Sequence, residues 1–276
     1  MKIIADTPTL YSPEEGKALG LAIIPACTII GEKVYRDFED ISCEEFLKKI
    51  EEGALPTTSQ PAIGDILEVF QETDDDMLVL PIGYGLSGTY QNMEGAKNLI
   101  ENNERIHIMD TKTLAGPQRY LVQKAMKLCK EGKGVEAIKS ELQKSIETSV
   151  SFVIPEDFNF LKRSGRLTPV AAKLVNMIKI VPVLTQTEDK RRITLFAIKR
   201  SGKKAITAII DHLKSIGVSE NWFVSVSHGG AKEKAKEVLA QIKEHFTGTD
   251  MELFALPPSL VTHGGPGCIV IQAIQK

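Results

Sequence analysis

Two hydroxyl-rich segments carry the side chains best suited to binding a ligand. Pro56–Pro61 contains Thr57, Thr58 and Ser59, and residues 86–91 read Leu-Ser-Gly-Thr-Tyr-Gln directly after an apolar run. Hydroxyl groups and the amides at the start of a helix donate hydrogen bonds to an anion without changing their protonation state. Because neither segment contains an acid or a base, the residues predict binding of a carboxylate or a phosphate, with no catalytic residue among them.

An arginine and a histidine in the second half of the chain could also contact an anion. Arg166 and Arg163 flank Ser164-Gly165 in an apolar neighbourhood, and the guanidinium fork suits a carboxylate or a phosphate. His263 precedes the run Gly-Gly-Pro-Gly, which indicates a loop that allows close approach of the backbone, and its ring could donate to an anion. The alternatives are a surface loop of solvated charges and a structural histidine.

A glycine pattern before the second hydroxyl segment offers an enzymatic alternative. Residues 83–88 match the dinucleotide pattern G-x-G-x-x-G, and Asp110 follows the next predicted strand. This combination is typical of a nicotinamide-dependent oxidoreductase, although the pattern lies well inside its domain and no companion residues for hydride transfer accompany it. The other interpretation is that Gly83, Gly85 and Gly88 only allow a tight turn into a helix.

Two further catalytic patterns fail on individual residues. A serine hydrolase needs glycine two places after its nucleophile, and Thr89 occupies that place after Ser87. Residues 200–204 read Arg-Ser-Gly-Lys-Lys and lack both the leading glycine and the final hydroxyl of a P-loop. We therefore expect a binding protein that is not an enzyme and has no ATP site or cofactor of its own.

The composition limits the partners and surroundings of the protein. With 276 residues, 25% of them charged, and a formal net charge of -2, the chain lacks the basic excess of a nucleic-acid-binding protein. Its four cysteines are scattered without a C-x-x-C pair, and neither paired histidines nor an acidic cluster suggests a metal. No segment has the apolar length of a signal peptide or a membrane span, so we expect a cytoplasmic protein.

Short apolar runs alternate with helical patterns, which predicts an α/β fold with a largely parallel N-terminal sheet and a mixed C-terminal α/β domain. The predicted strands are residues 2–5, 21–24, 77–82, 105–109, 150–154, 178–184, 192–198, 222–227 and 269–273. The predicted helices are residues 43–52, 63–73, 90–102, 118–130, 135–148, 203–215 and 231–245. The length suits two domains, 1–148 and 149–276. Both hydroxyl segments lead into a predicted helix, where ligands bind in open α/β sheets.

Several segments together resemble the DegV family of bacterial fatty-acid-binding proteins. They are, in chain order, Asp6-Thr7, Pro56–Pro61, Leu86–Gln91, Leu161–Leu167, Val181–Leu184 and His263–Gly267. Their order and spacing cover essentially the whole chain. The resemblance implies two α/β domains that enclose one long-chain fatty acid in a tunnel between them. It also implies the acyl-binding subunit of a bacterial fatty acid kinase, which presents the carboxylate to a separate ATP-binding subunit for acyl phosphate formation.

The resemblance assigns the fatty-acid head group to particular side chains. Those that bind the carboxylate or support the binding turn are Thr58, Ser87, Thr57 and Ser59. Those near a charged acyl phosphate are Arg166 and His263. Burial of the acyl chain, at about 0.8 kcal/mol per CH2, would dominate the affinity, and the hydroxyls would set the orientation.

The chain departs from the family pattern at two places. Gly83-Tyr84 stand where two serines usually precede Leu-Ser-Gly-Thr, and Val181 replaces the usual lysine. The Tyr84 hydroxyl could take the place of a lost donor. The expected function is a fatty-acid carrier, with transient contact to a membrane surface, and the alternatives are the oxidoreductase and a non-catalytic lipid sensor.

Overall fold

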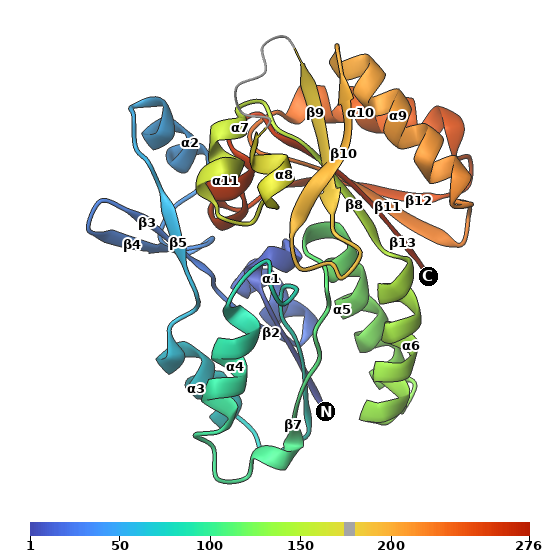
Figure 1. Ribbon diagram of the computed structural model, residues 1–276. Helices are drawn as coiled ribbons and strands as arrows, with labels where there is room; N and C mark the ends of the chain where they lie inside the picture. Colours follow the sequence, from blue (N-terminus) through green and yellow to red (C-terminus); the bar gives the residue numbers. More distant parts are fainter. Residues whose placement is uncertain (174–179) are drawn as a thin grey trace. The chain divides into compact units, whose positions relative to one another are not determined.

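The computed structural model describes residues 1–173 and 180–276, and the chain divides into two compact units (Figure 1). The N-terminal unit contains residues 1–147 together with Pro257–Ser259, and the C-terminal unit contains the described residues of 148–256 and 260–276. The sequence places a domain boundary after Thr148, whereas it carries no signal for the return of Pro257–Ser259 to the N-terminal unit.

A four-stranded sheet forms the centre of the N-terminal unit. Its order is β2 (Leu21–Ile24), β1 (Lys2–Asp6), β6 (Met77–Leu80) and β7 (Ile106–Ile108), and all neighbouring pairs are parallel. Every residue of β6 is buried, as expected for a central strand of a parallel sheet. The predicted parallel sheet is confirmed.

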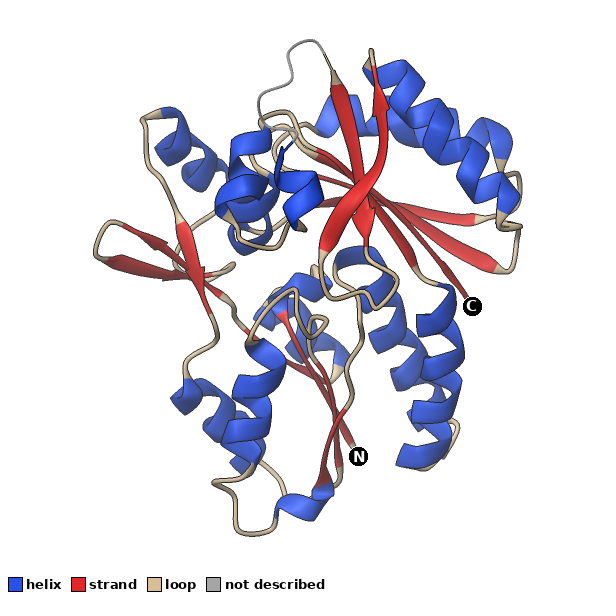
Figure 2. Cartoon of the chain, in the orientation of Figure 1, coloured by secondary structure: helices blue, strands red, loops and turns tan. Residues whose placement is uncertain are grey.

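Helices connect and cover these strands (Figure 2). The helices of the N-terminal unit are η1 (Thr7–Thr9), α1 (Pro13–Leu19), α2 (Cys43–Glu51), α3 (Ile63–Gln71), α4 (Thr89–Lys97), η2 (Asn103–Arg105), α5 (Ala115–Lys130) and α6 (Val135–Thr148), of which α2 lies away from this sheet (Figure 1). Ile66 and Phe70 of α3 and Met93 of α4 pack with Ile4 and Val79 of the sheet. The resulting core fixes the start of α4, the helix that follows the second hydroxyl segment.

The helix predicted at residues 90–102 is shorter in the structure. α4 ends at Lys97, and the amides of Leu99 and Ile100 bond to the carbonyls of Ala96 and Lys97, three residues back in each case. Such bonds tighten the last turn and end an α-helix. The missing turn lies at the end of α4 remote from the hydroxyl segment.

The first hydroxyl segment forms a strand rather than the predicted turn. β5 (Thr57–Ser59) is an edge strand of a three-stranded antiparallel sheet in the order β4 (Lys33–Arg36), β3 (Cys27–Ile30), β5. Threonine favours an extended backbone, and proline tends to lie at strand ends or edges because it cannot donate to the ladder. The partner strand β3 is distant in sequence, so no local pattern indicated this pairing.

A six-stranded mixed sheet forms the centre of the C-terminal unit. Its order is β10 (Ile193–Lys199), β9 (Val181–Gln186), β8 (Val150–Ile154), β13 (Ile269–Gln275), β11 (Trp222–His228) and β12 (Asp250–Ala255). The β11–β12 pair is parallel, and the other pairs are antiparallel. The predicted mixed α/β architecture is confirmed. Of the strand predicted at 178–184, residues 178 and 179 lie outside the described residues.

Two long helices cover one face of this sheet (Figure 2). The helices of the unit are α7 (Phe158–Arg163), α8 (Pro169–Ala172), α9 (Gly202–Ser215) and α10 (Lys232–His245), together with α11 (Pro258–Gly264) from Leu260 onward. Ile206 of α9 and Val238 of α10 pack with Ile154, Val224 and Ile271 of the sheet. The contact between helices and sheet forms the larger apolar core of the unit.

Candidate functional site

The two hydroxyl segments lie next to each other in the N-terminal unit. The side-chain amide of Asn92 donates to the carbonyl of Pro61 at 2.7 Å. Gln60 lies so close to Gly88 that a Cβ atom added to Gly88 would collide with its amide group. The structure therefore brings together two motifs that the sequence presents separately.

β5 presents its three hydroxyl side chains on two different faces. Thr57 and Ser59 are exposed, and Thr58 is half-buried on the opposite face because side chains alternate along a strand. Thr58 pairs across the strands with Thr28, which is fully buried. The geometry separates Thr58 from the two neighbours that were expected to support it.

Thr28 is a candidate binding residue that sequence reasoning missed. Its Oγ1 is buried and forms no hydrogen bond within the described residues. Buried hydroxyls are normally satisfied, so an unpaired one beside Thr58 indicates a place for an additional polar group. The only signal in the sequence is an isolated threonine in an apolar strand.

Ser87 lies directly before α4. Its Oγ accepts a hydrogen bond from the backbone N–H of Thr89 at 3.2 Å and is 2.9 Å from Thr89 Oγ1. Gly88 occupies the N-cap position and has no side chain that could cap the helix. Because the first amides of a helix lack partners within it and carry partial positive charge, Ser87 lies where an anion is favoured.

Tyr84 forms part of the same turn. Its ring centroid is 5.8 Å from that of Tyr90, with the two planes tilted by 59°. Its backbone N–H donates to Asp110 Oδ1 at 2.9 Å, and Lys112 N–H donates to the same oxygen at 2.9 Å. Asp110 therefore holds two backbone segments together, which gives it a local structural role.

Packing and backbone conformation account for Gly83 and Gly85 of the dinucleotide-like pattern. A Cβ atom on Gly83 would lie 2.8 Å from the backbone of Lys112 and Thr113. Gly85 has a φ of 90°, which side-chain-bearing residues rarely adopt, and Gly88 lies against Gln60. These local requirements favour the interpretation that the glycines shape the turn.

Arg166 and His263 lie near each other in the C-terminal unit. Burial lowers the pKa of Arg166, and its guanidinium Nη1 donates to the carbonyl of Ser164. Burial, together with the positive charge of Arg166, lowers the pKa of His263 to about 3. The imidazole is therefore neutral at physiological pH and can donate one N–H, while Arg166 supplies positive charge.

The surroundings of these two residues differ from the predicted ones. His263 lies in the last turn of α11, so the predicted loop begins only after it. The loop was predicted from the run Gly-Gly-Pro-Gly that follows His263. Arg163 lies with its guanidinium 4.5 Å from the centroid of the Phe160 ring, a cation–π contact.

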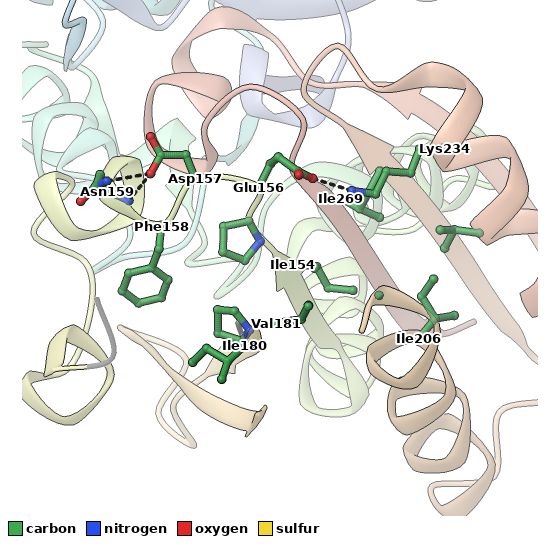
Figure 3. Close-up of a pocket in the computed structure, with 14 residues that line it drawn as sticks. Ile154, Glu156, Asp157, Phe158, Asn159, Ile180, Val181, Ile206, Lys234 and Ile269 are labelled. Carbon is green, nitrogen blue, oxygen red and sulfur yellow. Dashed lines mark hydrogen bonds and ion pairs between the residues drawn. The ribbon is translucent and has the colours of Figure 1, made fainter. Parts of the chain in front are cut away.

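The C-terminal unit contains a pocket of about 510 Å³ between its sheet and helices (Figure 3). Its apolar lining comes from β8, β9, β13, α9, α10 and the adjoining segments and includes Ile154, Phe158, Val181, Ile206, Val238 and Ile269. Its polar lining includes Asp157, Asn159 and the ion pair between Lys234 Nζ and Glu156 Oε2 at 2.6 Å. This size and lining are typical of a small-molecule site.

Comparison with known proteins identifies the family. Residues 1–276 match the family model described as "Uncharacterised protein, DegV family". A DegV domain-containing protein of Listeria innocua is 30% identical over 273 residues, covering 97% of this chain and 95% of the relative. The chain belongs to the DegV family.

Solved structures of DegV proteins share the fold of this one. The DegV fatty acid binding protein from Bacillus subtilis has a TM-score of 0.88 at 24% identity, covering 100% of this chain and 99% of that chain. A fatty-acid-binding DegV protein from Thermus thermophilus has the same TM-score and coverage at 26% identity. The fatty acid binding DegV protein SAG1342 from Streptococcus agalactiae reaches 0.87 at 26% identity, covering 100% and 98% of the two chains.

This DegV protein also contains two buried aspartates in its N-terminal unit. Asp6 accepts from Ile82 N–H at 3.1 Å and from the Gln118 side chain at 2.7 Å, and burial raises its pKa to about 7. Asp37 accepts from Thr7 Oγ1 at 3.0 Å, and burial raises its pKa to about 6. Sequence reasoning quoted Asp6 only as part of the family resemblance and missed Asp37.

The described residues of the DegV protein contain neither a metal-binding cluster nor a membrane-spanning helix. Among them, no three His, Cys, Asp or Glu side chains are grouped so as to hold a metal ion. No helix in residues 1–173 or 180–276 combines the length and apolar character that crossing a bilayer requires.

Proposed function

We propose that this protein binds one long-chain fatty acid and presents its carboxylate to a separate ATP-binding kinase subunit, with no catalysis of its own. The observation that carries the proposal is the pocket of the C-terminal unit, which has a volume suited to an acyl chain and apolar side chains from both the sheet and the helices in its lining. Membership of the DegV family supports it, since DegV proteins at 26% identity are described as fatty-acid-binding.

Burial of the acyl chain supplies most of the affinity in this proposal. Each CH2 that leaves water contributes about 0.8 kcal/mol, so fourteen contribute roughly 11 kcal/mol. Ile206 and Val238 offer apolar surface from two helices, while Ile154 and Ile269 offer it from the sheet. These apolar side chains form no hydrogen bonds with an acyl chain, so in this part of the pocket shape and length select the ligand.

Hydroxyls orient the carboxylate in the proposed complex. Thr58 and Ser87 bind its oxygens, and the first turn of α4 stabilises its charge. Arg166 supplies a positive charge and the neutral His263 a hydrogen-bond donor for the greater charge of an acyl phosphate. Thr57 and Ser59 have a lesser part, because they lie on the face of β5 opposite Thr58.

Titration of delipidated protein with stearate tests the carboxylate assignment. We expect Thr58→Ala combined with Ser87→Ala to weaken binding at least about tenfold, because hydrogen bonds to a charged group contribute about 1.5–3 kcal/mol each. Thr57→Ala is the matched control, because it removes a threonine hydroxyl from the opposite face of β5. This variant should leave the affinity unchanged. Equal affinity of the double variant and the wild type would contradict the assignment.

The kinase step needs a separate assay. The protein, stearate, ATP and a cognate ATP-binding subunit should together yield an acyl phosphate that hydroxylamine traps. The protein with ATP and stearate alone should yield none. Trapped product without the second subunit would show that the chain catalyses phosphoryl transfer itself, and stearate binding without product in the full mixture would favour a lipid sensor.

A further inference from the structure

Asp37 is a fully buried carboxylate that links distant parts of the chain. Its two oxygens accept hydrogen bonds from Thr7 Oγ1 at 3.0 Å, from the backbone N–H of Ser259 at 3.0 Å and from Ser259 Oγ. Asp37 N–H donates to the carbonyl of Ala26 at 2.9 Å, and Ala26 N–H donates to Thr7 Oγ1 at 2.9 Å. The carboxylate is thereby fixed from both its backbone and its side chain.

The start of α11 depends on this carboxylate. The first amides of a helix need partners outside it, and such partners usually come from the residue just before the first turn. Pro257 has no capping side chain, and Pro258 has no N–H. Ser259 N–H finds its partner in Asp37, 222 positions away. Asp37 therefore acts as a cap supplied from a remote part of the chain.

The same helix carries His263. Ser259 and His263 are four residues apart, so their side chains lie on one face of α11. The far end of the helix is fixed separately, since Gly265 N–H donates to Val261 O at 2.8 Å and Gly267 N–H donates to Gly229 O at 2.7 Å. The position of the imidazole is set by the two ends of a short helix, and Asp37 holds one of them.

We propose that Asp37 is a positioning residue for His263 and that its contact with Ser259 aligns α11 so that the imidazole can meet the ligand head group. The proposal rests on the proposed function for the ligand, whereas the alignment of the ring is independent of it. Asp37 acts through hydrogen bonds to the first turn of the helix and does not touch the fatty acid.

The alignment is tested first without a fatty acid. NMR signals of the His263 ring, assigned with His263→Gln, are compared in the wild type, Asp37→Asn, Ser259→Ala and Glu32→Gln. We expect Asp37→Asn to shift the His263 ring signals, with a smaller effect of Ser259→Ala. Glu32→Gln, an exposed control in the turn between β3 and β4, should have no effect. Unchanged ring signals in folded Asp37→Asn and Ser259→Ala would overturn the proposal.

A double-mutant cycle then tests whether Asp37 acts on the ligand through His263. We expect Asp37→Asn to weaken stearate binding about tenfold in the wild type and to have little effect in His263→Ala, because coupled residues are not additive. An equal loss in both backgrounds would show a merely structural role and refute the proposal. If the wild type bound no fatty acid, the proposed function would fail and the ring signals would decide the role of Asp37.

Discussion

Asp6 should make the protein less stable as the pH rises toward neutrality. The carboxyl group is fully buried, accepts hydrogen bonds from Ile82 and Gln118, and has no ion pair within the described residues. Burial raises its pKa from 3.8 to about 7. The folded state therefore holds the proton more tightly than the unfolded state does.

The sign and size of the effect follow from this difference. The stabilisation from the protonated form is complete below pH 3.8 and is lost as the pH rises through about 7. A difference of about three pH units corresponds to about 4 kcal/mol, at about 1.4 kcal/mol per unit. Burial of Asp37, whose pKa is raised to about 6, acts in the same direction.

Urea unfolding of the wild type and Asp6→Asn at pH 5 and pH 8 measures the effect. Asparagine does not titrate, so any constant cost of altered hydrogen bonding cancels between the two pH values. We expect the free energy of unfolding of Asp6→Asn, relative to the wild type, to rise by about 3 kcal/mol from pH 5 to pH 8. The exposed Asp75→Asn should show no such change. Parallel pH profiles of Asp6→Asn and the wild type would refute the reasoning.

Three further predictions concern the two units. Gly83→Ala should destabilise the protein by about 1–3 kcal/mol and weaken fatty-acid binding, because its methyl group would collide with the backbone of Lys112 and Thr113; urea unfolding and stearate titration measure both effects. Ile206→Phe should shift the preference toward shorter acyl chains by filling the pocket, whereas Ile198→Phe, outside the pocket lining, should not, as titration with a series of fatty acids would show. The His263 ring should remain neutral down to pH 5 in ligand-free protein, measured from its ring nitrogen shifts, because burial and Arg166 lower its pKa to about 3; a midpoint near 6.5 would contradict this account.

Strands and helices with a strong local pattern could be predicted from the sequence. The run Met77–Leu80 is apolar without alternation and forms a fully buried strand of the parallel sheet. Ser42 and Glu45 form the capping box expected before α2. In both cases the decisive residues lie within one turn or one strand, so local chemistry is sufficient.

Elements set by remote partners could not be predicted in this way. β5 is a three-residue strand that exists because β3 pairs with it. α11 has no cap from the residue before it, and Asp37, 222 positions away, accepts the hydrogen bond of Ser259 N–H instead. The same reason explains why the sequence suggested a loop around His263, which lies in the last turn of α11.

The candidate site likewise has features that local sequence predicts and features that depend on remote parts of the chain. The sequence identified the types of side chain that suit an anion, including Thr58 and Ser87, from their local motifs. It could not show that Thr57 faces away from Thr58, because this follows from an unexpected strand. Nor could it identify Thr28, whose importance depends on its position opposite Thr58 across two strands.

Native mass spectrometry of the purified protein, followed by denaturation and identification of any released small molecule, tests the central proposal most directly. We predict one long-chain fatty acid per chain, retained in the wild type and depleted in Thr58→Ala combined with Ser87→Ala. A protein that releases no lipid and fails to take up added stearate would contradict the proposal. Release of a nicotinamide nucleotide instead would reassign the turn at residues 83–88 to an oxidoreductase.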